Sequence, residues 1–198
     1  SGKLKGKQIK IPKNIKVRPT TDKSKEALFN ILVNRYDFEE IKVLDLFSGT
    51  GSMSYEFSSR GVKTVYSVDK SYSSTKFIKN FSDENNLNIN VLKRDIFKSN
   101  LETNIKFDLV FADPPYSNNE KYYTNLLSLL RKKLSNSNGS LLILEHPCSR
   151  VKELNLKILL KKLEYLQHGQ FLVSRQFLRI INLMLEWLVC MEIMVQMF

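Results

Sequence analysis

The feature that most constrains the fold is a repeated alternation of short apolar runs with longer segments of helical spacing. The apolar runs predict strands at residues 41–47, 64–68, 89–92, 107–112 and 140–144. The segments between and before them predict helices at residues 23–36, 52–60, 71–84 and 119–134. Strands separated by helices indicate a mostly parallel sheet covered on both faces, which is a doubly wound α/β fold.

Acidic residues stand at, or just beyond, the ends of successive predicted strands. They are Asp45, Asp69, Asp95 and Asp113. In a doubly wound sheet, ligands bind beyond the carboxyl ends of the strands, where the strand order reverses. We therefore expect these four carboxylates to border one crevice.

The stretch VLDLFSGTGSMS places Gly49 and Gly51 directly after the first predicted strand. Glycine allows a tight turn and a close approach of the backbone to a ligand. The pattern is not a dinucleotide-binding fingerprint, because Ser54 stands where the third glycine of GxGxxG would be. A strand-to-helix turn without a ligand is the alternative interpretation of these two glycines.

The acids around the glycines favour a nucleoside with a cationic tail over a dinucleotide. Asp45, inside the strand, would repel a pyrophosphate but could hold a positively charged amino group. Asp69 could accept hydrogen bonds from both hydroxyls of a ribose, and Asp95 could accept one from an adenine amine. Each acid alone is more often a solvated loop residue, but together they describe S-adenosyl-L-methionine better than NAD.

The run FDLVFADPPY ends the fourth predicted strand with Asp113, Pro114, Pro115 and Tyr116. Proline fixes φ and removes a backbone donor, so this step is rigid. Asp113 and the carbonyl of Pro114 could accept the two hydrogens of an exocyclic amine, and Tyr116 could stack on its base. Holding such an amine in line with a sulfonium methyl would promote transfer by positioning. A helix-starting turn is the alternative interpretation.

The first 22 residues form a basic arm. The cations that precede the first acid, Asp22, are Lys3, Lys5, Lys7, Lys10, Lys13, Lys16 and Arg18, and the whole chain has a net charge of +11. Basic charge concentrated in this way favours a polyanion partner, most often nucleic acid, over a merely solvated terminus.

Metal, disulfide and membrane roles have little support in the sequence. Cys148 and Cys190 form no CxxC, and His146 and His168 lack metal-ligand spacing, so we expect no metal site. No window reaches the roughly 18 uncharged apolar residues of a membrane span, and no signal peptide is evident. We expect a cytoplasmic protein without a membrane partner.

The order of VLDLFSGTGS and DPPY, with the leader GKLKGKQIKIP and the block VRPTTDKSKEALFNIL, resembles the RsmD family. That family methylates N2 of a guanine in small-subunit (16S) ribosomal RNA with S-adenosyl-L-methionine. The likeness covers residues 2–147 and implies a Rossmann-like class I methyltransferase fold. It implies an arm at residues 1–22, a methyltransferase domain at residues 23–147 and a closing segment at residues 148–198.

The resemblance also implies roles for individual residues. The expected cofactor-binding residues are Gly49, Gly51, Asp69 and Asp95, to which we add Asp45 and Phe47. The expected catalytic and target-base residues are Asp113, Pro114, Pro115 and Tyr116. The expected RNA-binding residues are Lys3, Lys5, Lys7, Arg18 and Thr20. The implied partner is ribosomal RNA or the assembling small ribosomal subunit, and we expect a monomer.

The segment 148–198 departs from the family. The family usually closes its sheet with an antiparallel hairpin that carries a Lys/Arg-Tyr-Gly sequence and a Phe-rich last strand. This segment instead has one glycine, Gly169, and a leucine- and methionine-rich end with helical spacing. The composition changes abruptly after about residue 163. We interpret the segment as a divergent helical closure of the domain or as the product of a shifted reading frame.

Other functions remain open at this point. A DNA adenine N6 methyltransferase shares DPPY but carries a separate target-recognition domain, for which 198 residues leave little room. A nucleic-acid-binding module of the same fold that has lost catalysis is disfavoured by the intact acids and DPPY, although the unusual tail keeps it open. A small-molecule methyltransferase would leave the basic arm without a purpose.

Overall fold

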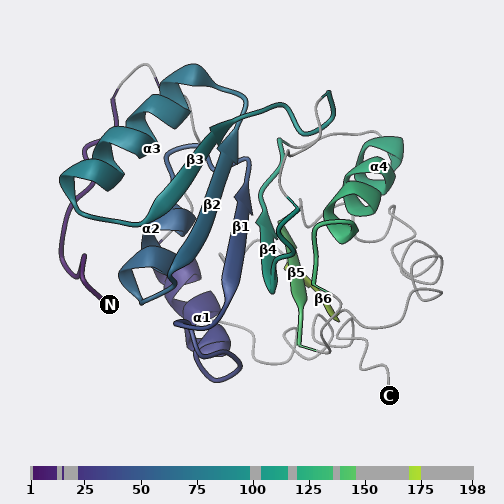
Figure 1. Cartoon of the computed structure of the whole chain (residues 1–198), viewed down its shortest axis with the longest axis horizontal. Helices are drawn as coiled ribbons and strands as arrows, with labels where there is room; N and C mark the ends of the chain where they lie inside the picture. The colour runs from purple at the N-terminus through teal and green to yellow at the C-terminus, as the bar shows by residue number, and fades with distance from the viewer. Residues whose placement is uncertain are drawn as a thin grey trace. The chain divides into compact units, whose positions relative to one another are not determined.

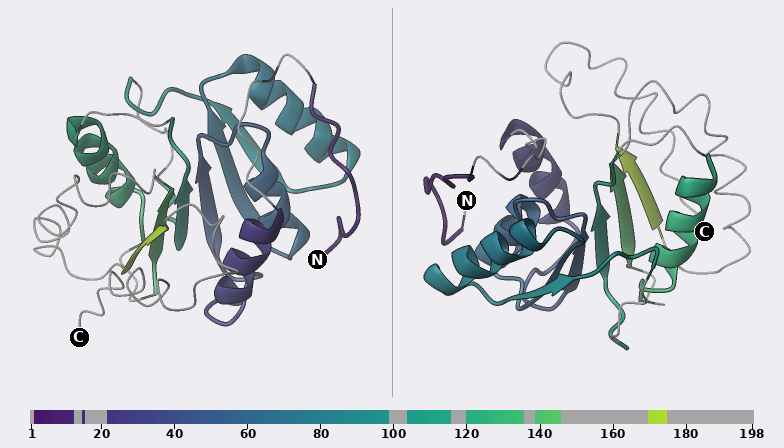
Figure 2. Two further views of the ribbon diagram at one scale, coloured as in Figure 1. Left: turned by 180° about the vertical axis from the view of Figure 1, so that it is seen from behind. Right: turned by 90° about the horizontal axis from the view of Figure 1, so that it is seen from above.

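The computed structural model describes residues 2–12, 15, 22–98, 104–115, 120–135, 139–145 and 170–174. The chain divides into two compact units, residues 1–105 and 106–198, whose helices and strands are drawn in Figures 1 and 2. Each helix and strand that the alternation predicts is present, with ends that differ by a few residues.

The elements follow one another as the sequence pattern indicates. The first unit contains α1 (Asp22–Leu32), β1 (Lys42–Leu46), α2 (Ser52–Ser59), β2 (Thr64–Asp69), α3 (Tyr72–Glu84) and β3 (Ile89–Lys93). The second unit contains β4 (Leu109–Ala112), α4 (Glu120–Arg131), β5 (Leu141–Glu145) and β6 (Gln170–Ser174).

The strands of the first unit form a parallel sheet in the order β3-β2-β1. Asp45 of β1 lies beside Ser67 of β2, and Asp69 of β2 lies beside Lys93 of β3. Because all three strands run in the same direction, their carboxyl ends lie at one edge of this sheet. That edge carries the predicted cofactor-binding residues.

The helices of the first unit are joined by aromatic contacts. Phe29 of α1 packs edge-on against Phe57 of α2 with ring centroids 4.7 Å apart, and Tyr55 of α2 contacts Phe81 of α3 at 4.4 Å. Figure 1 shows α2 and α3 alongside β1, β2 and β3. This packing fixes the position of α2, whose first residue, Ser52, follows the turn that contains Gly49 and Gly51, called the glycine turn.

The second unit is also parallel, in the order β4-β5-β6. Every residue of β4 and the first four residues of β5 are buried, as the continuous apolar runs predict for strands covered on both faces. Helix α4 contributes the buried side chains of Tyr123, Leu126 and Leu130.

Strand β6 corrects the expectation of a helical tail. Residues 170–174 pair in parallel with residues 141–145 of β5, so this part of the tail is a strand and not a helix. The segment QFLVS is short and rich in residues that favour strands, and the edge of β5 offers unpaired backbone groups. Pairing with β5 argues against a shifted reading frame as the origin of this strand. The other residues of the tail lie outside the described residues.

Two buried hydroxyl groups in the first unit, those of Tyr55 and Ser67, have no hydrogen-bond partner among the described residues. Burial, and secondarily the charge of Asp45, raises the pKa of the Tyr55 phenol, which therefore stays protonated near neutral pH. A buried hydroxyl without a partner destabilises a protein by about 1–3 kcal/mol.

We expect Tyr55→Phe to leave the free energy of unfolding unchanged or to raise it by about 1 kcal/mol, because the substitution removes an unsatisfied polar atom and keeps the ring. Chemical denaturation followed by circular dichroism measures this difference. A loss of about 1 kcal/mol instead would show that the hydroxyl has a partner in solution, such as an ordered water.

Candidate active site

The turn between β1 and α2 has an unusual backbone. Phe47, Gly49 and Gly51 all have left-handed conformations, with φ of 59°, 55° and 79°. Phe47 is strained there, because side chains with a Cβ rarely adopt positive φ. A Cβ at Gly51 would also come within 2.8 Å of the Ile78 side chain and 2.9 Å of the Tyr55 ring. The turn therefore requires glycine at position 51.

Asp69, the last residue of β2, holds this turn in place. Its Oδ2 accepts a hydrogen bond from the backbone N–H of Gly49 at 2.9 Å, and its Oδ1 accepts one from the backbone N–H of Ser71 at 2.8 Å. Asp69 is partly exposed. Each carboxylate oxygen can accept more than one hydrogen bond, so the predicted contact with ribose hydroxyls is compatible with both backbone bonds.

Ser48 joins the ends of β1 and β2, a role that the sequence analysis missed. Its hydroxyl oxygen accepts a hydrogen bond from the N–H of Val68 at 3.0 Å and donates to the carbonyl of Asp45 at 2.8 Å. Its carbonyl accepts from the N–H of Gly51 at 2.7 Å. A serine before a glycine is a common turn residue, but the strand that it would reach is not evident from the sequence.

Asp45 fastens α2 to β1. Its side chain is buried, with 1% of the residue exposed, and its Oδ2 accepts hydrogen bonds from the N–H of Ser54 at 3.1 Å and from the Ser54 hydroxyl at 2.5 Å. A carboxylate is favourable at the N-terminal end of a helix. The predicted contact of Asp45 with a cationic tail stays a prediction, and it would have to use the acceptor positions that Ser54 leaves.

Asp95 lies just beyond β3 and is partly exposed. Its Oδ1 accepts a hydrogen bond from the N–H of Phe97 at 3.1 Å. The Phe97 ring is 6.5 Å from the Phe47 ring, measured between centroids, and 40% of Phe97 is exposed. Two aromatic rings thus meet between the ends of β1 and β3.

This edge fits the adenosyl part of the predicted cofactor. Asp69 offers acceptors for ribose hydroxyls, Asp95 offers an acceptor for an adenine amine, and the rings of Phe47 and Phe97 offer apolar surface for a purine. Phe97 was not among the predicted site residues, and its position after Asp95 is the one signal in the sequence that indicates it.

A further side chain that the sequence analysis missed is Lys25 of α1. Its ammonium group donates a hydrogen bond to the hydroxyl of Ser52 at 3.0 Å. Ser52 is the first residue of α2 and directly follows Gly51. The helix before the sheet therefore brings a cation to the glycine turn.

The second unit contains the four residues predicted to hold the target base, and the structure describes three of them. Asp113, Pro114 and Pro115 directly follow β4. Asp113 is partly exposed, Pro114 is buried and Pro115 is exposed. The step therefore leaves the carboxylate within reach of solvent while one proline is packed. Tyr116 lies outside the described residues.

The start of the basic arm packs against the carboxyl ends of α2 and α3. The N–H of Lys3 donates to the carbonyl of Ser59 at 3.0 Å. The ammonium group of Lys7 donates to the Asn85 side chain and lies 6.0 Å from the centroid of the Phe81 ring. Two of the predicted RNA-binding residues, Lys3 and Lys7, therefore belong to a segment that packs against the ends of these helices.

The docked part of the arm lies away from the glycine turn. In a parallel α/β unit, a helix that follows a strand starts at the strand's carboxyl end and returns to the opposite end of the sheet. Lys3, Lys5 and Lys7 are exposed and lie at that opposite end. Their contact with RNA remains a prediction, and Arg18 and Thr20 lie outside the described residues.

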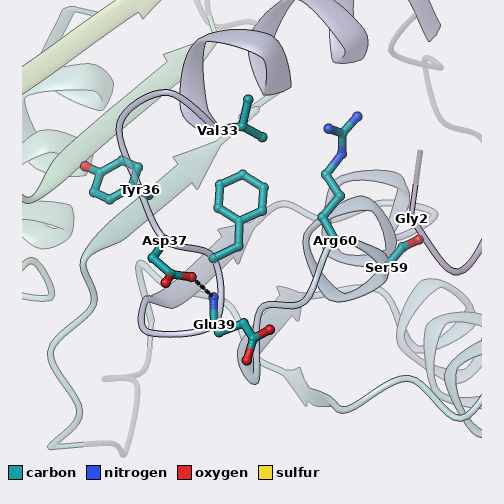
Figure 3. A pocket seen from close by; sticks show the side chains of 8 residues that line it. Gly2, Val33, Tyr36, Asp37, Glu39, Ser59 and Arg60 are labelled. Atoms are coloured by element: carbon teal, nitrogen blue, oxygen red, sulfur yellow. Dashed lines mark hydrogen bonds between the residues drawn. The ribbon is translucent and has the colours of Figure 1, made fainter.

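A cavity of about 450 Å³ is also found at the end of the unit that is remote from the glycine turn. It is lined by Gly2, Val33, Tyr36, Asp37, Phe38, Glu39, Ser59 and Arg60 (Figure 3). Asp37 accepts a hydrogen bond from the N–H of Glu39 at 3.0 Å, Glu39 pairs with Lys63, and Arg60 pairs with Glu56. Because its charged groups already have partners within the chain, we assign no ligand to it.

Two other kinds of site can be checked in the part of the chain that the structure describes. There, no helix combines the length and the apolar character that crossing a membrane requires, and no three His, Cys, Asp or Glu side chains gather so that they could hold a metal ion. The residues that the sequence analysis judged to lack metal-ligand spacing lie outside it: Cys148, Cys190, His146 and His168.

Comparison with known proteins gives consistent matches. The sequence pattern of the family described as conserved hypothetical protein 95 matches residues 1–171. The chain is 33% identical to an uncharacterized methylase of Rickettsia prowazekii, over 73% of this chain and 83% of that protein. It is 30% identical to ribosomal RNA small subunit methyltransferase D of Buchnera aphidicola, over 73% of each chain. A solved structure of a putative methyltransferase from Escherichia coli has a TM-score of 0.58 at 24% identity, over 69% of this chain and 74% of that one, which shows the fold.

We expect Asp69→Ala to weaken binding of S-adenosyl-L-methionine at least tenfold and to lower the free energy of unfolding by about 2 kcal/mol, because two backbone N–H groups lose their acceptor. Isothermal titration calorimetry and chemical denaturation measure the two effects. Asp83→Ala is the matched control, because Asp83 is an exposed acid of α3 paired only with Lys79 in the described structure and such pairs contribute little. Cofactor affinity as strong in Asp69→Ala as in the control would contradict the assignment.

Proposed function

The chain belongs to the RsmD family, described as conserved hypothetical protein 95, and from this premise we propose that it transfers a methyl group from S-adenosyl-L-methionine to the exocyclic N2 amine of a guanine in small-subunit ribosomal RNA. The observation that carries the proposal is the family match over residues 1–171, which includes both the glycine turn and the Asp-Pro-Pro step. The fold is the Rossmann-like α/β fold of the class I methyltransferases.

The cofactor part of the proposal rests on the first unit. S-adenosyl-L-methionine, when bound, supplies a methyl group on a positively charged sulfur. Asp69 and Asp95 would orient the adenosyl part, and the glycine turn would let it approach the backbone closely. Asp45 and Lys25 bring one negative and one positive group to the first turn of α2, where the zwitterionic end of the cofactor would need opposite charges.

The chemical part rests on Asp113 and the prolines. An amine attached to an aromatic ring is a poor nucleophile, because its lone pair is delocalised into the ring. If the carboxylate of Asp113 and the carbonyl of Pro114 each accept one of its hydrogens, the nitrogen is favoured to become pyramidal and its lone pair is freed. Asp113 and Pro114 would hold the amine in this form for the methyl group that a bound cofactor supplies, and the bond from nitrogen to the methyl carbon would form as the carbon–sulfur bond breaks. The proton lost from nitrogen passes to Asp113 or to water.

The partner and the setting are part of the same proposal. The N2 amine of a guanine in folded RNA must be exposed by splaying the base out of its stack, and Tyr116 would then stack on it. We propose that ribosomal RNA, alone or in the assembling small subunit, is the substrate, and that the chain acts as a cytoplasmic monomer. The domain boundaries near residues 22 and 147 belong to this proposal as well.

One experiment tests the substrate directly. The chain is incubated with S-adenosyl-L-methionine labelled in its methyl group and with undermethylated small-subunit ribosomal RNA, the assembled subunit, or DNA. Nuclease digestion followed by chromatography then identifies the modified nucleoside. Label in N2-methylguanosine supports the proposal, whereas label only in N6-methyladenine of DNA would replace it with the DNA adenine methyltransferase alternative.

We expect Asp113→Asn to lower the rate of methyl transfer by roughly 10²–10⁴-fold, because an amide holds the position but is a weaker proton acceptor. Affinity for S-adenosyl-L-methionine should stay within about twofold, since the residue would contact the amine and not the cofactor. Single-turnover transfer and calorimetry separate the two quantities. Asp108→Asn, at the opposite end of β4, serves as the control, with thermal melting to confirm that both variants fold. Transfer at the normal rate in Asp113→Asn would refute the role.

A further inference from the structure

We propose that Tyr72, Lys76 and Lys93 form a docking surface for an unpaired segment of ribosomal RNA, a proposal that rests on the function proposed above. This surface, called the Tyr72 platform, lies in the first unit at the start of α3 and the end of β3. It is separate from the basic arm, to which the sequence analysis assigned the RNA contacts.

The platform is built around one exposed aromatic ring. Tyr72 is the first residue of α3, and 63% of it is exposed. The ammonium group of Lys76, one turn further along α3, lies 5.9 Å from the centroid of the Tyr72 ring, and that of Lys93 at the end of β3 lies 5.5 Å from it. Two elements far apart in sequence therefore place cations around the same ring.

The charges of the platform are available for a partner. Among the described residues, neither Lys76 nor Lys93 forms an ion pair with a carboxylate, and both side chains are exposed. By contrast, Lys79 of α3 pairs with Asp83 at 2.6 Å, and Lys63 pairs with Glu39 at 3.0 Å. The lysines around Tyr72 thus differ from Lys63 and Lys79 in facing a ring and not an acid.

An exposed ring flanked by cations suits single-stranded nucleic acid. Proteins that bind unpaired strands combine aromatic rings, on which bases stack, with positive groups that follow the phosphate backbone. Regular duplex DNA keeps its bases stacked on one another and offers none to the ring, whereas loops and bulges of RNA do. The geometry of the platform therefore favours RNA with unpaired bases over duplex DNA.

The platform adjoins the candidate active site within the same unit. Tyr72 directly follows Ser71, whose N–H is bonded to Asp69, and Lys93 lies beside Asp69 in the register of the sheet. Further exposed cations at these strand ends are Lys70, Arg94 and Lys98. RNA held on the platform would pass beside the edge of the sheet at which Asp69 and Asp95 lie. The docked lysines of the arm lie at the other end of this sheet.

The test compares variants of the full chain for binding to undermethylated small-subunit ribosomal RNA over a series of salt concentrations. The ring is tested with Tyr72→Ala and with Tyr72→Phe, which keeps the stacking surface. The charges are tested with the double variant Lys76→Gln/Lys93→Gln. The matched control is Lys63→Gln/Lys79→Gln, which removes the same charge from lysines that are paired with acids. Affinity for S-adenosyl-L-methionine is measured for every variant.

We expect Tyr72→Ala to weaken RNA binding by roughly 5- to 100-fold, the range that stacking of one base represents, and Tyr72→Phe to bind within about twofold of the unaltered chain. The double variant at positions 76 and 93 should bind more weakly and lower the slope of log affinity against log salt by about 0.7 for each phosphate that it no longer neutralises. The control variant and the cofactor affinities should change by less than about twofold.

Several results would overturn the platform. These are normal RNA affinity in Tyr72→Ala, an equal loss in the control variant, tighter binding of duplex DNA than of RNA, and a parallel loss of cofactor affinity. The experiments distinguish a wrong assignment of the platform from a wrong assignment of the function. Methylation of guanine by a chain whose RNA affinity does not depend on Tyr72 would overturn the platform alone. Absence of guanine methylation with Tyr72-dependent RNA binding would overturn the function alone.

Discussion

The geometry of the first unit depends on the carboxylate of Asp69. Its two oxygens accept hydrogen bonds from the backbone of the turn after β1 and from the backbone before α3, and the backbone carbonyl of the same residue accepts one from Arg94 after β3. One residue thereby ties together the ends of three strands. Backbone N–H groups that point toward a buried or partly buried carboxylate form charge-assisted hydrogen bonds, which are stronger than neutral ones. The glycine turn, the start of α3 and the cofactor edge thus share a common support.

The two ends of the first unit have different characters. At the carboxyl ends of the strands, acids, aromatic rings and cations remain partly exposed, and these are the groups that a nucleoside and an RNA strand require. At the other end, Arg60 pairs with Glu56, and Lys7 bonds to Asn85 at the end of α3. This distribution agrees with the rule that parallel α/β sheets bind ligands beyond the carboxyl ends of their strands.

Hydrophobic alternation predicted each helix and strand of the first unit and the first three elements of the second. Local pattern suffices there, because an apolar run covered on both faces and an amphipathic helix each have a distinct period. The helix predicted to reach Tyr36 ends at Leu32 and continues only as turns, since propensity defines ends poorly. The prediction of a helical tail was wrong for residues 170–174, because the short apolar segment QFLVS pairs with the open edge of β5.

The sequence by itself determined the order of the elements, the acids at the strand ends, the glycines at the turn and the basic character of the arm. It did so because each of these depends on residue type and on spacing along the chain. The tertiary structure alone decided that Ser54 binds Asp45, that Ser48 reaches Val68, and that Lys76 and Lys93 converge on Tyr72. These contacts join strands and helices whose register and packing are set by the whole core, so no local pattern encodes them.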